Sequence, residues 1–246
     1  MNKIYSNNYP IINLYKKASS KSEVVTQMIY GEGFKVISKT LKWLKIKIKE
    51  DKYIGYIKKK KFIYYVKPTH KVSVIFAKTY KTLNSKNKTL KLPYASKIKI
   101  NEVNLKFSKF QNRWIKTKDI KPLDYKNKYV FEDIKIFKNT KYIWGGKTFK
   151  GIDCSALIQV CFNFNNKVCP RDSGQQQNFF KKNINIKNIK KNDIIYWKGH
   201  VAVALSNKLL IHAYGPRKKT VIMSIPNTIK LIKKTANLKV ISVKRI

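Results

Sequence analysis

The chain has 246 residues, 43% of them hydrophobic, so it can bury a sizeable core in one or two domains, or in more if some are small modules. Three cysteines exclude a disulfide framework, and no uncharged apolar run approaches the roughly 18 residues of a membrane span. The net charge of +43 permits a polyanion partner such as nucleic acid, an anionic membrane surface or an acidic polymer. Only four of the 55 basic residues are arginine, however, and lysine, asparagine and isoleucine dominate, so a nucleotide bias in the genome would also explain the charge.

Residues 1–66 predict a small β module. Short runs rich in β-branched and aromatic residues lie close together and are separated by turn sequences such as "YGEG" at 30–33. In "WLKIKIK" (43–49), strict alternation places Leu44, Ile46 and Ile48 on one face of a strand. Short strands at this spacing favour a small β-barrel.

Residues 67–124 repeat this pattern more weakly, with strand-like runs at 72–78, 90–100 and 113–123. Trp43 and Trp114 begin comparable strands in the two segments. We therefore expect a second, related small β-barrel. The alternative is one all-β domain without duplication.

From residue 125 to residue 246 the pattern changes to α+β. Apolar spacing predicts a helix over 124–140, a second helix that starts at Cys154 and buries Cys161, and a short helix over 173–182. Strands are expected at the end of the chain, at 193–197, 200–205, 209–214 and 220–225.

Cys154 follows the glycine-rich stretch "YIWGGKTFKGID". A thiol at a helix start lies near unpaired N–H groups and the positive end of the helix dipole, which should lower its pKa. The glycines allow a tight approach and leave room for a substrate. They would serve any tight turn equally well, so this stretch alone does not establish a nucleophile.

Two of the three histidines, His200 and His212, lie in neighbouring predicted strands. The arrangement predicts Cys154 as nucleophile, His200 as general base and then acid, and His212 as the residue that orients His200. Two alternatives compete: partly buried histidines without a catalytic role, and a zinc site. The spacings between Cys154, Cys161 and Cys169 match no common zinc pattern, and no metal is expected.

These motifs together resemble the NlpC-type papain-like cysteine peptidases of bacteria. The resemblance rests on "YIWGGKTFKGIDCSALIQ", "NDIIYWKGHVAVAL" and "LLIHAYG", and covers about residues 125–225. The first half is similar to the two bacterial SH3-type domains that precede the peptidase in one subgroup. The implied fold is two small all-β SH3-like barrels (1–66 and 67–124) followed by an α+β peptidase domain (125–246).

The resemblance also implies roles for individual residues. Cys154, His200 and His212 would form the triad, and Tyr142 would stabilise the oxyanion beside the Cys154 N–H. Asp153, Ser155 and Ser173 would line the subsite for the substrate's free amino group. Glu32 and Tyr53 of the first β domain would cap that subsite, with Tyr56 as the alternative tyrosine and a surface turn acid as the alternative role for Glu32.

The implied activity is hydrolysis of the bond between γ-D-glutamate and a diamino acid (diaminopimelate or lysine) in stem peptides with a free N-terminal L-alanine. No cofactor and no specific nucleic acid are expected, and a monomer is favoured. The segment "MNKIYSNNYPIINLYKK" has no apolar run of signal-peptide length, so we expect a cytoplasmic enzyme of wall-peptide recycling. The alternative function is an anionic-polymer binding protein with a degenerate peptidase domain.

Overall fold

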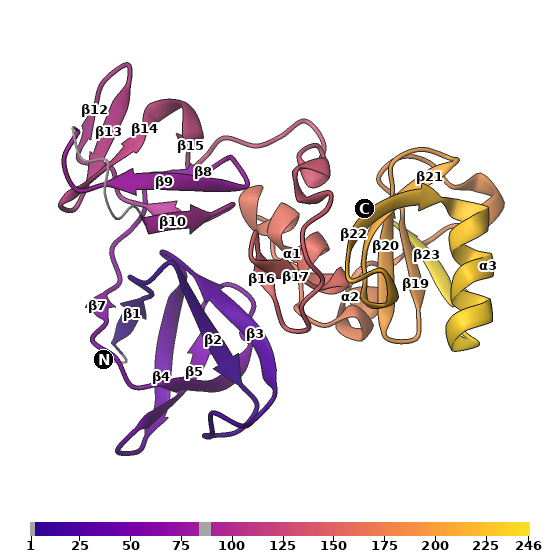
Figure 1. Ribbon diagram of the computed structural model, residues 1–246, viewed down its shortest axis with the longest axis horizontal. Helices are drawn as coiled ribbons and strands as arrows, with labels where there is room; N and C mark the ends of the chain where they lie inside the picture. Colours follow the sequence, from indigo (N-terminus) through magenta and orange to yellow (C-terminus); the bar gives the residue numbers. More distant parts are fainter. Residues whose placement is uncertain (1–2, 84–89) are drawn as a thin grey trace. The chain divides into compact units, whose positions relative to one another are not determined.

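The computed structural model describes residues 3–83 and 90–246, and Figure 1 labels its elements. Their contacts divide the chain into two compact units. The first unit holds Met1–Lys126 and the short segment Lys147–Phe149, and the second holds Asn127–Gly146 and Lys150–Ile246. The domain boundaries expected near residues 66 and 124 stay predictions.

The first β module is a seven-stranded sheet in the order β3-β2-β6-β5-β4-β1-β7. As expected from the alternation, Leu44, Ile46 and Ile48 are buried and pack in one core with Leu14 and Phe34. The strands are β1 (Ile4–Ser6), β2 (Ile11–Tyr15), β3 (Val24–Ile29), β4 (Gly33–Lys39), β5 (Trp43–Ile48), β6 (Ile54–Lys58) and β7 (Ile63–Tyr64).

The second β module has its own core, which includes Val72, Leu92, Phe110 and Ile115. Its strands form a five-stranded sheet, β10-β9-β14-β13-β12, and a three-stranded sheet, β11-β8-β15. The elements are β8 (His70–Val72), β9 (Phe76–Tyr80), β10 (Leu90–Pro93), β11 (Lys97–Ile98), β12 (Glu102–Val103), β13 (Phe107–Phe110), β14 (Arg113–Lys116), η1 (Thr117–Asp119) and β15 (Ile120–Pro122).

The prediction of closed barrels was wrong: the structure has β-rich, SH3-like sheets that stay open. In the first module the edge strands are β3 and β7. Strand β7 has only two residues, both exposed, so its hydrogen-bond ladder is too short to close the sheet on β3. In the second module, the residues between Val72 and Phe76 are not in a strand. They separate β8 from β9, and the strands of the module form two sheets.

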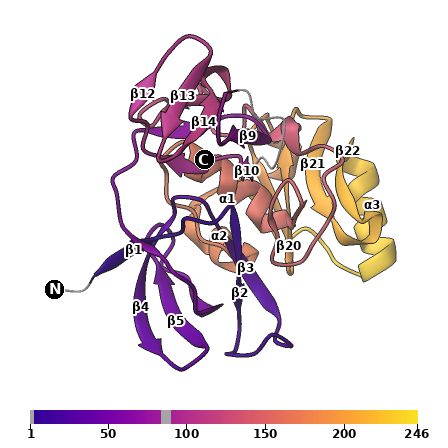
Figure 2. The ribbon, with the colours of Figure 1, turned by 60° about the vertical axis from the view of Figure 1, so that its left-hand side comes forward.

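The second unit is α+β, as predicted, and is built on the antiparallel sheet β18-β23-β19-β20-β21-β22. Helix α1 contacts β20 and β21, and α3 contacts β22. Figures 1 and 2 show these two helices on opposite faces of the sheet. The elements are η2 (Ile134–Phe137), β17 (Gly151–Ile152), α1 (Cys154–Phe164), α2 (Ser173–Phe179), β18 (Lys182–Asn183), η3 (Ile186–Asn188), β19 (Ile194–Trp197), β20 (His200–Ala204), β21 (Leu209–Tyr214), η4 (Gly215–Arg217), β22 (Lys219–Ser224), α3 (Ile225–Ala236) and β23 (Ser242–Arg245).

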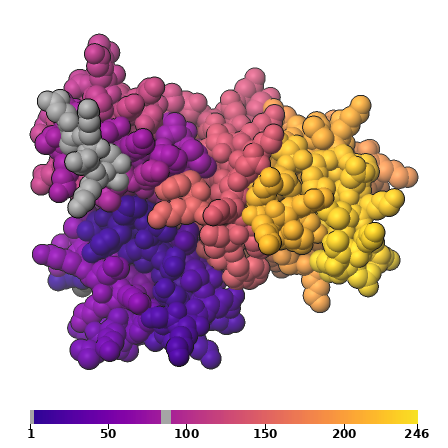
Figure 3. Space-filling model, in the orientation of Figure 1, coloured from indigo at the N-terminus to yellow at the C-terminus, as the bar shows by residue number. Residues whose placement is uncertain are grey.

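Helix α3 and strand β23 were not predicted. Ser224 caps α3 by accepting the Asn227 backbone N–H, and Pro226 lies in its first turn. The helix buries Ile225 and Ile232 against the sheet, where they share a core with Trp197. Its lysines Lys230, Lys233 and Lys234 are exposed. Figure 3 draws this C-terminal part of the chain in yellow.

The helix predicted over 124–140 does not form. Val130, Ile134 and Phe137 are buried as the spacing predicted, but turns and the single 3-10 segment η2 place them. Asn127 donates its side-chain amide to Asp133 at 2.8 Å and its backbone N–H to the Asn165 side chain at 2.8 Å. These side-chain bonds compete with the helical hydrogen-bond pattern. Among the described residues, no helix is both long enough and apolar enough to cross a membrane.

Candidate active site

The segment ahead of Cys154 turns tightly, and two of its glycines are required by geometry. Gly145 has φ +72°, in the left-handed region that favours glycine. A Cβ on Gly146 would lie 2.6 Å from the Gly151 carbonyl oxygen, so no larger residue fits. The backbone N–H of Asp153 donates to the Gly146 carbonyl at 3.2 Å, which closes the turn just before α1 begins at Cys154.

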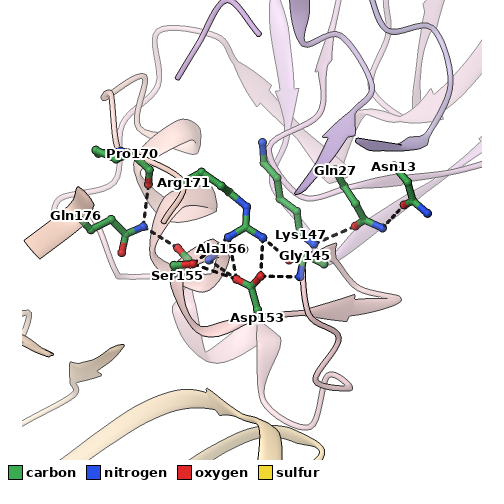
Figure 4. Close-up of polar contacts among 11 residues, drawn as sticks. Asn13, Gln27, Gly145, Lys147, Asp153, Ser155, Ala156, Pro170, Arg171 and Gln176 are labelled. Atoms are coloured by element: carbon green, nitrogen blue, oxygen red, sulfur yellow. Dashed lines mark hydrogen bonds and ion pairs between the residues drawn. The ribbon is translucent and has the colours of Figure 1, made fainter. Parts of the chain in front are cut away.

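Asp153 is the N-cap of α1, and its carboxylate is fully engaged. It accepts the backbone N–H of Ala156 and that of Gly145, both at 2.9 Å. Arg171 approaches it in a bidentate pair, with Nη1 2.9 Å from Oδ1 and Nη2 2.5 Å from Oδ2. Both side chains are buried. One carboxylate therefore fixes the glycine turn, the helix start and Arg171 relative to one another (Figure 4).

Ser155 and α2 are tied to the same arrangement. The Ser155 hydroxyl donates to Asp153 at 3.2 Å and accepts from Arg171 Nη1 at 2.9 Å. Gln176 of α2 donates to the backbone carbonyls of Ser155 and Pro170, each at 2.9 Å. Ser173 is the first residue of α2 and is half-buried.

His200 and His212 lie on neighbouring antiparallel strands, and their rings meet. His200 Nε2 and His212 Nδ1 are 2.9 Å apart. The tautomer decides which ring donates this bond: if His200 donates from Nε2, its Nδ1 is unprotonated, as the predicted role of general base requires. His212 then carries its proton on Nε2, a buried atom without a hydrogen-bond partner among the described residues. The Tyr214 ring stacks on His212 at 4.8 Å and 12° and restrains it further.

Cys154 and the histidine strand meet at the start of β20. The Cys154 sulfur accepts hydrogen bonds from the backbone N–H groups of Val201 and Ser155. Val201 directly follows His200, so the thiol lies beside the strand end that carries the imidazole. Tyr142 is half-buried and close enough for the charge on Cys154 to raise its pKa, in addition to the larger rise caused by burial.

Burial dominates the titration of the triad. It raises the pKa of Cys154 to about 12, and the nearby Asp153 charge adds to that rise. Burial lowers the pKa of His200 to about 4 and that of His212 to about 3. The expected low thiol pKa at the helix start was therefore wrong: desolvation outweighs the helix dipole and the two N–H bonds to sulfur. These pKa values correspond to a thiol and two neutral imidazoles in the predicted triad at neutral pH.

Glu32 and Tyr53 belong to the first unit. Glu32 is buried in the turn between β3 and β4, where its Oε2 accepts the Ile29 backbone N–H at 2.8 Å and its Oε1 lies 2.5 Å from Lys147 Nζ. Tyr53 is half-buried and packs against the core of the first β module. Tyr56 pairs with Tyr15 across strands β6 and β2. The amine-binding roles of these residues stay predictions.

The described residues include no group of three or more histidine, cysteine or acidic side chains that could hold a metal ion. Cys161 and Cys169 are fully buried and form no disulfide with another described residue. Cys161 lies in α1, all of whose residues are buried, and it is buried there as its position in the sequence predicted.

Two segments of the chain match known families. Residues 139–238 match the NlpC/P60 family, and residues 14–62 match the bacterial dipeptidyl-peptidase SH3 domain. Residues 139–238 thus form an NlpC/P60 domain. The segment that matches contains Cys154, His200 and His212.

Similar proteins span different shares of the chain. Dipeptidyl-peptidase 6 of Lysinibacillus sphaericus is 39% identical over 74 residues, which are 30% of this chain and 27% of that protein. A γ-D-glutamyl-L-lysine dipeptidyl-peptidase of Bacillus cereus is 23% identical over 242 residues, 85% of this chain and 72% of that protein. The chain spans 42% of a probable endopeptidase NlpC homolog of Haemophilus influenzae, so it covers less than half of two of these relatives.

The fold extends over the whole chain in a solved structure. The crystal structure of an NlpC/P60 family protein from Bacillus cereus has a TM-score of 0.85 to this chain, with 18% identity over 98% of this chain and 99% of that one. An NlpC/P60 α+β domain thus follows β-rich SH3-like sheets in both proteins.

Sequence reasoning assigned no role to Arg171, Gln176 or Lys147. Arg171 and Gln176 are part of "PRDSGQQ", and arginine is rare in this lysine-rich chain, so Arg171 could have been singled out. Lys147 could not, because nothing in the sequence distinguishes it from the other lysines of the chain.

The raised thiol pKa predicts how Cys154 reacts with iodoacetamide. Only the thiolate reacts, so the alkylation rate should rise about tenfold per pH unit between about pH 6 and 9 without a plateau. Mass spectrometry of the Cys154 peptide measures this rate, and Cys161 and Cys169 serve as buried internal controls. A rate that is constant across this range would indicate a preformed thiolate–imidazolium pair and contradict the prediction.

Proposed function

We propose that the protein is a cysteine peptidase that hydrolyses the amide between γ-D-glutamate and a diamino acid in peptidoglycan stem peptides. The observation that carries the proposal is the constellation at the start of α1 and β20. Cys154 lies beside Val201, and His200 is bonded to His212. A nucleophile, a base and a group that orients the base are the three parts that covalent amide hydrolysis requires.

The protonation states suggest the order of events. Because both Cys154 and His200 are neutral at pH 7, the thiol attacks the substrate carbonyl as its proton passes to His200. His212 Nδ1 accepts from the imidazolium and stabilises it. The Cys154 N–H and Tyr142 are proposed to bind the oxyanion. The amine then leaves with the proton from His200, and water hydrolyses the thioester.

The names of similar proteins support the choice of the γ-D-glutamyl–diamino acid amide as the bond that is cleaved. Two curated relatives, from Bacillus cereus and Bacillus subtilis, carry the name γ-D-glutamyl-L-lysine dipeptidyl-peptidase, which favours lysine as the diamino acid. The SH3-type match at residues 14–62 belongs to a domain named for bacterial dipeptidyl-peptidases. A role in recycling and a cytoplasmic location are part of this proposal.

The decisive experiment incubates the reduced protein with L-Ala-γ-D-Glu-L-Lys and identifies the products by mass spectrometry. We expect L-Ala-D-Glu and free lysine. The matched control is the isomer joined through the α-carboxyl of D-glutamate, which should stay intact. A folded protein that cleaves neither peptide, or both equally, would refute the proposed specificity.

A further inference from the structure

A buried ion pair joins the first β module to the segment that precedes the candidate nucleophile in the chain. Lys147 Nζ lies 2.5 Å from Glu32 Oε1, and the two side chains are 0% and 2% exposed. Glu32 Oε2 is occupied as well, by the Ile29 backbone N–H at 2.8 Å. Burial raises the pKa of Glu32, and the Lys147 ammonium opposes that rise. The carboxylate that the resemblance assigned to a substrate ammonium already has an ammonium from its own chain.

The rest of the segment Lys147–Phe149 is held by the first unit too. The Lys147 backbone N–H donates to Gln27 Oε1 at 2.9 Å, and Gln27 in turn donates to the Asn13 side chain at 2.9 Å (Figure 4). The Phe149 ring lies 4.8 Å from that of Phe76 in the second β module. Both β modules therefore contact these three residues.

The position of this segment in the chain gives these contacts a consequence. Gly146 and Lys150, its immediate neighbours, belong to the second unit. Gly146 accepts the Asp153 backbone N–H, and Asp153 caps the helix that begins at Cys154. Lys147 directly follows Gly146 in the chain. Contacts that hold Lys147 in place therefore also restrain the backbone of the glycine turn.

We propose that Glu32 and Lys147 are positioning residues, which anchor the turn that leads to Cys154, and that Glu32 does not bind the substrate's amino group. The tests of this inference that measure peptide turnover rest on the proposed function, whereas those that measure stability or alkylation do not. It assigns the first β module a part in holding the nucleophile in place, and it assigns the selection of the substrate's amino end to other groups.

The test compares Lys147→Met, Glu32→Gln and the double variant with the wild-type protein. Each single change leaves one buried ion without its partner, so both should lower the melting temperature, whereas the double variant removes both charges and should regain much of it. A loosened turn misplaces the thiol, so we expect kcat to fall about 10- to 100-fold in all three while KM stays within about twofold. The exposed Lys150→Met, which removes the same charge from the neighbouring segment, should retain the wild-type kcat.

Two further measurements separate positioning from amine binding. The ratio of kcat/KM for L-Ala-γ-D-Glu-L-Lys to that for its N-acetylated form should be the same in Glu32→Gln as in the wild type. If Glu32 held the amine, this ratio would collapse in Glu32→Gln, and that result would overturn the inference. The inference would also be overturned if Lys147→Met were less stable than the wild type but kept the wild-type kcat when folded.

Alkylation of Cys154 by iodoacetamide gives a substrate-free readout. At one fixed pH, and at a temperature where circular dichroism shows the variants to be folded, the rate should differ several-fold between Lys147→Met and the wild type. An unchanged rate would overturn the inference. A wild type that cleaves no peptide would refute the proposed function and leave this readout valid.

Discussion

Replacing Cys154 with alanine is expected to lower the hydrolysis of L-Ala-γ-D-Glu-L-Lys by about a thousandfold or more. The variant lacks the sulfur that forms the acyl intermediate, and neither neutral histidine can replace it. Cys154 is buried at a helix start, and a methyl group in its place leaves the cap by Asp153 intact. We therefore expect the melting temperature to change little, and a product assay by mass spectrometry measures the loss of activity.

The matched control is Cys161→Ala, which removes a thiol from the same helix. Cys161 is fully buried seven residues further on and has no part in the triad. We expect it to cost about 1 kcal/mol of stability and to retain the wild-type rate. Substantial cleavage by Cys154→Ala, or equal losses in the two variants, would show that the nucleophile lies elsewhere.

The second large effect is expected for Arg171→Met. This change removes both bonds of the bidentate pair and leaves the Asp153 carboxylate buried with only N–H and hydroxyl partners. Breaking a buried ion pair from one side typically costs about 3–5 kcal/mol. The free energy of unfolding, measured in urea, should fall by that amount. Activity should fall as well, because Asp153 fixes both the glycine turn and the start of α1.

Arg217→Met provides the comparison, because it removes the same charge from an exposed position in η4. Its free energy of unfolding should stay within about 0.5 kcal/mol of the wild-type value. The double variant Asp153→Asn, Arg171→Met should recover part of the lost stability, since no unpaired ion remains. A loss below about 1 kcal/mol in Arg171→Met would mean that the pair is not essential to the turn.

Local patterns predicted many of the individual strands. The alternation at 43–49 placed Leu44, Ile46 and Ile48 in a core, because a strand with one buried face needs that period. The same reasoning failed where side chains satisfy the backbone. Between residues 124 and 140 the apolar spacing was helical, but the bond from Asn127 to Asp133 stabilises turns instead. Closure of a sheet depends on the length of its edge strands, which the sequence of any one strand does not determine.

The sequence predicted the reactive residues of the candidate site but not the buried ion pairs that hold them in place. Cys154 could be recognised because it follows a glycine-rich stretch, and the two histidines because they lie in neighbouring predicted strands. The two buried ion pairs could not be recognised in this way, because their partners are far apart in the sequence. Lys147 and Glu32 are 115 residues apart, and Arg171 and Asp153 are 18 apart. The thiol pKa was misjudged for a related reason. Helix position can be predicted from sequence, but the desolvation that raises the pKa of Cys154 to about 12 requires the complete fold.

The segment Lys147–Phe149 limits how this protein can be divided for engineering. A fragment that starts at residue 127 would contain Cys154, His200 and His212, the predicted triad, and on sequence grounds it would look like an independent catalytic module. It would also carry Lys147 and Phe149 without Glu32, Gln27 or Phe76, the residues that bury and bind them. Exchange of the N-terminal part for that of another protein therefore requires that the new partner supply a carboxylate for this lysine.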